Sequence, residues 1–165
     1  MLQFILGTLT SYAGGHSHYA KYIAGGLLSS VMLCASVQAD DATYLAPEGR
    51  SNTPYSESVI YGGFIFLAGK LGTVPGTGKL AEGGIGPQTR QTLENIKTAL
   101  ERVGGSMDSV LKCNVFLADI DEWAAMNAVY TTFFKNKPAR TAIGNAGLIP
   151  GARVEIECMA AAPSP

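Results

Sequence analysis

Histidine is almost absent from this chain, and its scarcity excludes several kinds of site. The only histidines are His16 and His18, and both precede residue 40. The rest of the chain therefore offers no histidine as a metal ligand, and no metal-binding cluster is expected there. It also offers no histidine to activate a serine or a cysteine, so Ser-His and Cys-His pairs are excluded.

The chain also lacks an excess of charge of either sign. Its 165 residues include 12 basic and 13 acidic ones. Without a basic excess, we do not expect a charge-driven binding site for nucleic acid. Hydrophobic residues make up 47% of the chain and charged ones 15%, which predicts one domain of ordinary size with a core of its own.

Acidic residues are missing from the first 39 residues, which contain one base, Lys21. An apolar and small-residue run over 23–35 is followed by Ser36-Val37-Gln38-Ala39. A basic start, a short apolar segment and a small-residue cleavage site are typical of a secretory signal peptide, and the run is shorter than the ~20 residues of a membrane span. We expect a signal peptide over 1–39, cleavage after Ala39, and a periplasmic or secreted protein.

Cysteine is scarce as well. Without residues 1–39, the chain keeps Cys113 and Cys158 and has a net charge of −2, from 11 bases and 13 acids. Cys113 alternates with Leu111 and Val115, and Cys158 lies in a similar alternation, so both are expected as small hydrophobic residues of the core. A disulfide between them requires Cα atoms within ~7 Å and is the less favoured alternative.

Periodicity predicts the order strand, strand, helix, strand, helix, strand, strand. Residues 40–53 are polar and rich in turn formers, and are expected as a flexible lead-in to a domain over 54–165. The first five elements are expected over 55–61, 64–70, 87–103, 109–118 and 119–133, followed by a strand after Pro138 and one over 153–160. Two helices on one face of a mixed sheet make an α+β fold.

Each predicted helix has one apolar stripe. In the first helix the stripe is Leu93, Ile96, Leu100 and Val103, and Gly104-Gly105 ends the helix. In the second, Asp119 is expected to cap the helix, with Glu122 completing a capping box. The stripe of this helix is Trp123, Met126, Tyr130 and Phe133, with Asn127 at its edge.

The strand Phe64–Ala68 is apolar on both faces. If helices cover one face of the sheet, the other face needs a second cover, and a neighbouring subunit is the simple one. The glycine-rich segment 71–86 lacks the Lys and Ser/Thr of a phosphate-binding loop, so it is expected as a connection.

Candidate chemistry concentrates in the last third of the chain. Arg140 follows a proline, and the alternation over 153–160 places Glu155 and Glu157 on one face. Leu148–Gly151 is a short loop, so the strands on either side are expected to lie near each other, with Arg140 facing Glu155 or Glu157 across a small cleft. Such a cleft suits a small anionic substrate; a purely structural salt bridge is the alternative.

A long ordered pattern resembles the RidA/YjgF family of imine deaminases. It comprises P-Y-S at 54–56, F-L-A-G-K at 66–70, Q-T-R-Q-T-L-E-N at 88–95, N-A-V-Y at 127–130, P-A-R-T-A-I at 138–143 and G-L-I-P-G-A-R-V-E-I-E at 147–157. The resemblance implies a chorismate-mutase-like fold assembled as a homotrimer, with clefts between subunits and no cofactor.

The activity that the resemblance implies is hydrolysis of 2-iminopropanoate and 2-iminobutanoate to 2-oxo acids and ammonia. The family's carboxylate-binding arginine corresponds to Arg140 and its water-orienting glutamate to Glu155. Tyr55, Gly69 and Asn127 correspond to positions that line the same cleft. The expected partners are small 2-imino acids and two further copies of the chain, with neither nucleic acid nor, after signal removal, a membrane.

Three departures from the family pattern bear on substrate size: Lys70 replaces a Gln, Thr141 replaces a Ser or Cys, and the segment before Pro138 is short. The alternative function is a non-catalytic trimer that binds metabolites or proteins in a chaperone-like or regulatory role. Arg140 favours the deaminase. The endoribonuclease activity ascribed to some relatives fits poorly with a net charge of −2 and with export.

Overall fold

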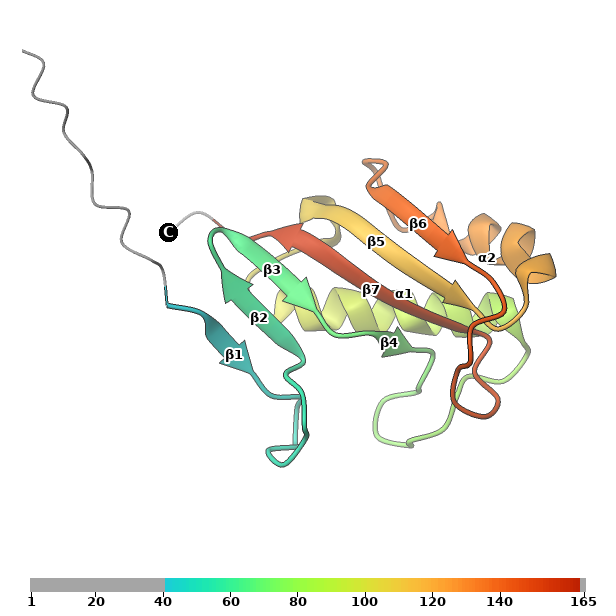
Figure 1. The fold of residues 1–165 in the computed structure, drawn as a ribbon, viewed down its shortest axis with the longest axis horizontal. Helices are drawn as coiled ribbons and strands as arrows, with labels where there is room; N and C mark the ends of the chain where they lie inside the picture. The colour runs from blue at the N-terminus through green and yellow to red at the C-terminus, as the bar shows by residue number, and fades with distance from the viewer. Residues whose placement is uncertain (1–40, 164–165) are drawn as a thin grey trace, which may run out of the picture. The chain divides into compact units, whose positions relative to one another are not determined.

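A computed structural model describes residues 41–163 (Figure 1). In it, segments in which apolar and polar residues alternate form strands, and segments whose apolar residues have helical spacing form helices. The strands of this part are β1 (Thr43–Leu45), β2 (Ser58–Tyr61), β3 (Phe64–Leu67), β4 (Lys70–Leu71), β5 (Val110–Leu117), β6 (Ala139–Ile143) and β7 (Val154–Ala161). The helices are α1 (Ile85–Glu101), α2 (Trp123–Tyr130) and two short 3-10 helices, η1 (Met107–Ser109) and η2 (Ile120–Glu122). Within 41–163, no helix is long and apolar enough to cross a membrane.

The strands form one mixed sheet in the order β1-β2-β3-β7-β5-β6. Every pairing is antiparallel except that of β5 with β6, which are connected through α2. The β2–β3 hairpin turns at Gly62-Gly63, where φ is 56° and 79°, a conformation that glycine adopts without steric cost. The chain breaks from the sheet at Ala68-Gly69. β3 pairs with the end of β7, and β4, after the break, pairs with residues nearer the start of β7.

β6 and β7 are consecutive in the sequence but are not neighbours in the sheet, because β5 lies between them. The expectation that the loop at Leu148–Gly151 places these two strands side by side is therefore wrong. β6 pairs instead with β5 in parallel, with Arg140 beside Cys113. Strand order depends on pairing across the whole chain, which the length of one loop does not determine.

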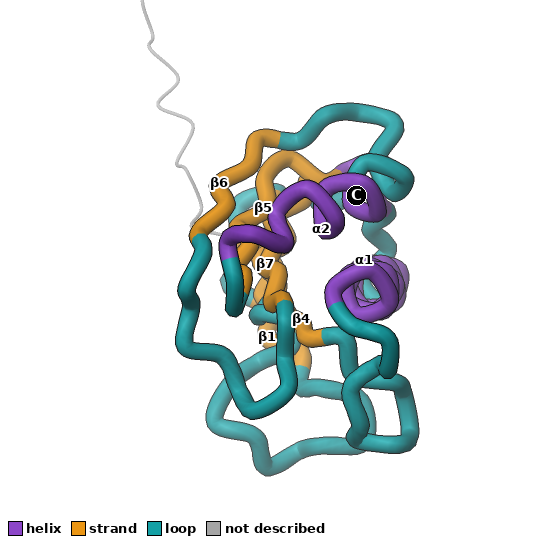
Figure 2. The backbone as a smooth tube through the Cα atoms, turned by 90° about the vertical axis from the view of Figure 1, so that its right-hand side faces the viewer, coloured by secondary structure: helices purple, strands orange, loops and turns teal. Residues whose placement is uncertain are grey.

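The apolar stripe of α1 packs on the sheet as expected. Leu93, Ile96 and Leu100 are fully buried, and Val103 is partly buried against the same core. α1 begins at Ile85, two residues before Pro87, the expected start. In Figure 2 both helices lie on one side of the strands, which confirms the predicted arrangement of two helices on one face.

The start of α2 differs from the expected capping box. Asp119 caps the short helix η2 by accepting a hydrogen bond from the Asp121 amide at 3.0 Å. The Glu122 carboxylate does not fold back; it forms a salt bridge with Arg153, with an Nη2–Oε1 distance of 2.6 Å. A cation just before β7, Arg153, therefore takes the place of the expected backbone partner.

Two further expectations are wrong in detail. Part of the predicted lead-in over 40–53 forms β1, whose residues pair with β2. Leu111 was expected on the buried face of its strand together with Cys113, but its side chain is 46% exposed. A bulge between Val110 and Lys112 adds one residue to β5, and this extra residue turns Leu111 out of the core.

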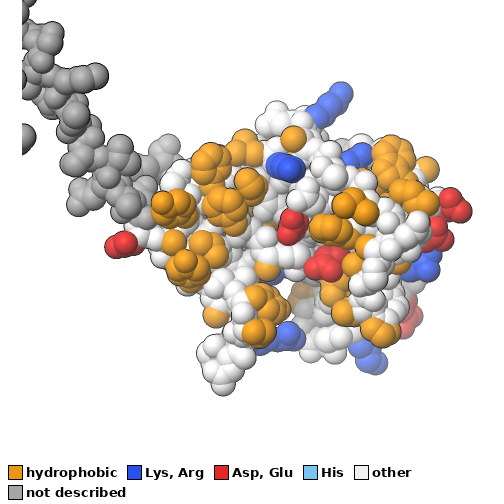
Figure 3. Space-filling view, in the orientation of Figure 1, with side chains coloured by type: hydrophobic (Ala, Val, Ile, Leu, Met, Phe, Trp, Pro, Cys, Tyr) orange, Lys and Arg blue, Asp and Glu red, His pale blue; other side chains and the backbone are white. Residues whose placement is uncertain are grey.

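The face of the sheet opposite the helices is not covered by any of residues 41–163. Phe64 and Phe66 lie on it and are 42% and 38% exposed, whereas Ile65, between them, is fully buried under the helices. Figure 3 shows hydrophobic side chains gathered on this face, toward the hairpin of β2 and β3. We call this surface the open face. The strand Phe64–Leu67 is apolar on both sides, as predicted, but the chain covers only one of them.

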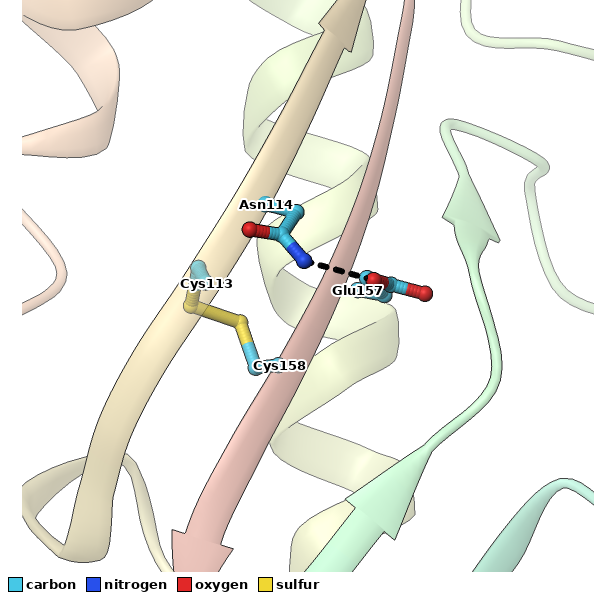
Figure 4. Close-up of a disulfide and its surroundings, with 4 residues drawn as sticks. All are labelled: Cys113, Asn114, Glu157 and Cys158. Carbon is cyan, nitrogen blue, oxygen red and sulfur yellow. Dashed lines mark hydrogen bonds between the residues drawn. A yellow bond between two sulfur atoms is a disulfide. The ribbon is translucent and has the colours of Figure 1, made fainter. Parts of the chain in front are cut away.

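Cys113 and Cys158 form a disulfide between β5 and β7, and the expectation of two unpaired thiols is wrong (Figure 4). They are directly opposite in the antiparallel pairing, with Cα atoms 4.1 Å apart. Both side chains are buried under the helices, as their alternation predicted. The register of the two strands, which the sequence alone does not specify, is what brings the sulfur atoms together.

Candidate functional site

Arg140 lies in β6, at the edge of the sheet, and packs against α2. Its guanidinium lies over the ring of Tyr130, 4.6 Å from the centroid, and 5.5 Å from the centroid of Trp123. Its Nη1 donates a hydrogen bond to Asn127 Oδ1 at 2.8 Å. The two aromatic faces and the amide hold the guanidinium in one place. Arg140 and Asn127, both expected to line one cleft, are thus in contact.

Arg140 has no carboxylate within salt-bridge distance in residues 41–163. Arg153, by contrast, is paired with Glu122, and Arg102 with Glu57. Asn127 is also the only hydrogen-bond acceptor that Arg140 has in this part of the chain. A half-buried cation that has one neutral partner keeps N–H groups available for an anionic ligand.

Glu155 lies in β7 against Gly69, at the break between β3 and β4. A Cβ atom at Gly69 would overlap the Glu155 carboxylate, so a larger residue there would displace the carboxylate from its position. The register partners of Glu155 are Leu71 in β4 and Phe116 in β5. Of the residues expected to line one cleft, Gly69 and Glu155 are thus in contact.

These two pairs of residues lie on opposite faces of the sheet. Arg140 is the register partner of Cys113, and laterally paired residues share a face, so Arg140 is on the face that the helices cover. Glu155 is three residues from Cys158 along β7 and therefore on the open face. The expectation that Arg140 faces Glu155 or Glu157 within one chain is wrong.

Tyr55 and Glu157, the other predicted residues, are not hydrogen-bonded to the rest of the candidate site within 41–163. Tyr55 lies in the loop before β2 and is 52% exposed, and its carbonyl accepts a hydrogen bond from the Thr53 hydroxyl at 2.8 Å. Glu157 is on the open face and accepts a hydrogen bond from Asn114 at 2.7 Å, visible in Figure 4. Neither residue has a hydrogen bond to another predicted site residue within 41–163.

From the sequence, Trp123 and Tyr130 were expected only in the apolar stripe of a helix. Their contact with the Arg140 guanidinium was not predicted. Tyr130 is 5% exposed, and burial raises the pKa of its hydroxyl, an effect that the neighbouring Arg140 charge partly opposes. Trp123 is 40% exposed at the edge of the same cluster. The spacing of Trp123, Asn127 and Tyr130, at intervals of four and three residues, already placed all three on one face of a helix.

The description "Endoribonuclease L-PSP" belongs to the family model that matches residues 46–162, which is most of the chain. The chain belongs to this family, the RidA/YjgF family. Its fold is accordingly the chorismate-mutase-like α+β fold. RidA from the Antarctic bacterium Psychrobacter is 38% identical and has a TM-score of 0.63, covering 72% of this chain and 95% of that one. Yeast Mmf1 is 31% identical with a TM-score of 0.66, covering 74% and 100%.

Two curated relatives are similar over the same region. A RutC family protein of Pyrococcus horikoshii is 44% identical over 108 residues, which are 65% of this chain and 86% of that protein. The 2-iminobutanoate/2-iminopropanoate deaminase of Capra hircus is 41% identical over 108 residues, 65% of this chain and 79% of that protein. RidA/YjgF relatives that are named for imine hydrolysis are thus among the matches.

The signal peptide and periplasmic location expected from residues 1–39 need correction. The RidA/YjgF relatives mmf1 and mmf2 of Schizosaccharomyces pombe are named as mitochondrial, and they are 38% and 42% identical to this chain. Organelle-targeting segments are poor in acidic residues, as secretory signals are, so the lack of acids does not indicate export. Residues 1–39 and the predicted cleavage after Ala39 lie outside the described part of the structure.

The two side chains that depart from the RidA/YjgF pattern lie apart from each other. Lys70 is the register partner of Ile156, on the helix side, and its Nζ is 2.6 Å from Glu57 Oε1. Burial lowers the pKa of Lys70 to about 8. Thr141 pairs with Asn114 on the open face. Each departure therefore changes a different face of the sheet.

Proposed function

We propose that this protein hydrolyses reactive 2-imino acids to 2-oxo acids and ammonia. The observation that carries the proposal is the Arg140 guanidinium, which two aromatic rings and one amide hold in place without a carboxylate partner among residues 41–163. The purely structural salt bridge considered as the alternative for Arg140 is not formed there. The name of the goat relative supports the same activity.

Arg140 binds the carboxylate of the imino acid in this proposal. A guanidinium presents N–H groups in a planar fork that matches both oxygens of a carboxylate, and a lysine ammonium does not reproduce that geometry. The Asn127 amide keeps the fork oriented through its bond to Nη1. The Trp123 ring, partly exposed beside the guanidinium, is placed to contact the substrate side chain.

Glu155 is the proton acceptor for the attacking water. As the water oxygen bonds to the imine carbon, Glu155 takes one water proton, the C=N π bond breaks and the nitrogen becomes an amine that takes up a proton. The resulting 2-amino-2-hydroxy acid then loses the nitrogen as ammonia, and its hydroxyl proton is released as the C=O bond forms. The balance is one imino acid and one water giving one 2-oxo acid and one ammonia, without any redox step.

The active unit in this proposal is a homotrimer with a site at each subunit boundary. One chain holds Arg140 and Glu155 on opposite faces of its own sheet, so a complete site requires residues from two copies. The open face, with Phe64 and Phe66 exposed, offers apolar surface for that contact. Closed rings of identical subunits place the same pair of surfaces at every boundary.

The proposal is tested by generating imino acids in solution from several amino acids and measuring the rate of 2-oxo acid release above the spontaneous rate. Arg140→Ala removes charge-assisted contacts of ~1.5–3 kcal/mol each, so kcat/KM should fall at least ~100-fold, with little rescue in Arg140→Lys. Arg90→Ala is the matched control, because Arg90 is exposed and also lies over an aromatic ring, Phe133. If the wild-type protein does not raise the rate above the spontaneous one, the proposed deaminase activity is wrong.

Glu155→Gln separates chemistry from binding. The substitution keeps the side-chain shape but removes the proton acceptor, so kcat should fall by ~100-fold or more. Calorimetric titration with 2-oxobutanoate should show binding retained in Glu155→Gln and lost in Arg140→Ala. Binding by a wild-type trimer without turnover would instead favour the non-catalytic, metabolite-binding alternative.

A further inference from the structure

α1 turns several polar side chains toward the protein interior. Gln88, Thr89 and Thr92 are 5%, 0% and 0% exposed, alongside the apolar stripe that the spacing predicted. Asn95, one helical turn after Gln91, is half-buried on the same helix. Buried amides are costly unless they are hydrogen-bonded, so the partners of Gln88 and Asn95 indicate what they do.

Gln88 binds the backbone at the entrance to β7 with both ends of its amide. Its Nε2 donates to the Gly151 carbonyl at 3.0 Å, and its Oε1 accepts from the Arg153 amide at 2.8 Å. Arg153 is two residues before Glu155 in the same extended segment. One side chain of α1 thus fixes the backbone that leads directly to Glu155.

Asn95 binds the backbone of the neighbouring segment in a corresponding way. Its Nδ2 donates to the carbonyls of Leu71 and Thr73, at 2.9 and 2.8 Å, and its Oδ1 accepts from Gln91 at 2.9 Å. Leu71 is the register partner of Glu155 in the pairing of β4 with β7. The amide of Asn95 therefore fixes the strand beside Glu155.

The two segments that these amides bind come together on α1. A Cβ atom at Gly72 would lie 2.7 Å from the Gln88 carbonyl oxygen, so the chain after Leu71 lies directly against the helix. Gly69, two residues before Leu71, leaves the space that the Glu155 carboxylate occupies. Gln88 and Asn95 therefore act on the two backbone segments that together determine where this carboxylate lies.

We infer that Gln88 and Asn95 are positioning residues for Glu155: they hold the backbone on either side of it, so that its carboxylate stays in line with the attacking water. The inference rests on the proposed function of Glu155. An apolar side chain of similar size would fill the same volume, but it would leave the Gly151 carbonyl, the Arg153 amide or the Leu71 carbonyl unpaired, and the segment would shift to find other partners.

Gln88→Met and Asn95→Leu test the inference, since both are uncharged and close in size to the original residues. A displaced general base loses much of its effect, so kcat should fall about 10-fold or more in each variant. The affinity for 2-oxobutanoate should stay within about twofold, because the Arg140 cluster is untouched. This split between kcat and binding distinguishes a positioning role from a loss of folded protein.

Thr92→Val is the matched control. Thr92 is buried on the same helix, and its hydroxyl has no hydrogen-bond partner among the described residues. Its replacement by a residue of the same shape should leave both kcat and binding at wild-type values. If Gln88→Met does not fold, Gln88→Glu replaces it, because a carboxylate still accepts from Arg153 but no longer donates to Gly151.

A second measurement follows Glu155 without relying on turnover. The NMR chemical shift of the Glu155 side-chain carboxyl carbon, recorded at one pH in each protein, should change in Gln88→Met and Asn95→Leu but not in Thr92→Val, because only the first two variants displace the backbone on either side of Glu155. An unchanged shift with kcat within about twofold of wild type would overturn the inference, leaving two amides that only stabilise the fold. If the wild type itself does not hydrolyse imino acids, the proposed function fails, and the chemical shift alone decides the positioning.

Discussion

Arg140 and Cys113 are register partners in the parallel pairing of β6 with β5, so the Arg140 side chain leaves the sheet on the face that carries the disulfide. Glu155 leaves the same sheet on the other face. The thickness of the sheet separates the two residues within one chain. The proposed chemistry therefore predicts cooperation between copies, which mixing experiments measure.

Mixing two inactive variants should restore activity. Arg140→Ala and Glu155→Gln are each expected to be nearly inactive, but a boundary that takes its arginine from one variant and its glutamate from the other is complete. After equal amounts are unfolded and refolded together, about a quarter of the sites should be active if subunits associate at random. Arg140→Ala mixed with Arg140→Lys is the control and should gain nothing. A mixture of the first two variants that remains inactive would place both residues of a site in one subunit.

Phe66→Asp should break the assembly while leaving the fold intact. Phe66 is 38% exposed on the open face, so a charge there is solvated in a single chain but buried against a neighbouring copy. Light scattering should show a trimer for the wild type and a monomer for the variant, with similar circular dichroism spectra. Lys97→Asp, on the exposed side of α1, is the control and should stay trimeric. A wild-type monomer at micromolar concentration would contradict the proposed assembly.

Reduction of the Cys113–Cys158 disulfide should lower the free energy of unfolding. The bond closes a loop between residues 45 positions apart, which in the chain-entropy model is worth about 4 kcal/mol. Urea unfolding with and without reductant measures the difference, and the double variant Cys113→Ala, Cys158→Ala should not respond to the reductant. If alkylation after unfolding modifies both Cys113 and Cys158 in protein kept under oxidising conditions, the bond does not form.

Lys70 should make the protein more stable as the pH rises above about 8. Burial lowers the pKa of Lys70 to about 8 from its usual 10.5, so between these pH values the unfolded chain binds the proton that the folded chain has released. Stability then rises with pH through this window, relative to Lys70→Gln, and the difference is constant below it. Urea unfolding at several pH values measures the effect. Lys135→Gln, which removes an exposed ion pair with Asp108, should keep the pH dependence of the wild type.

Local patterns predicted the elements well, because the periodicity of side chains is a property of each segment by itself. Leu93, Ile96 and Leu100 are buried as their spacing indicated. The bulge that exposes Leu111 left no mark on the alternation of apolar residues, and β1 is a strand of three residues in a segment rich in turn formers. Both features depend on pairing with another strand, which the local pattern does not contain.

The geometry of the candidate site could not be predicted from the sequence. The motifs assigned Arg140, Asn127, Glu155 and Gly69 to one cleft, whereas within one chain Arg140 contacts Asn127 and Glu155 contacts Gly69 in two separate places. The position of β5 between β6 and β7 is a property of the whole sheet. The face on which Arg140 emerges depends on the register of β6 against β5, and a shift of one residue would reverse it.

A sheet that presents Arg140 on one face and Glu155 on the other also makes the proposed activity a function of concentration. A very dilute solution would contain correctly folded chains whose sites are only half built, and the rate per chain would rise as copies associate. Synthesis of the protein in small amounts would then yield less activity per molecule than synthesis in larger amounts. The concentration of the protein would then determine what fraction of its chains is assembled and able to remove imines.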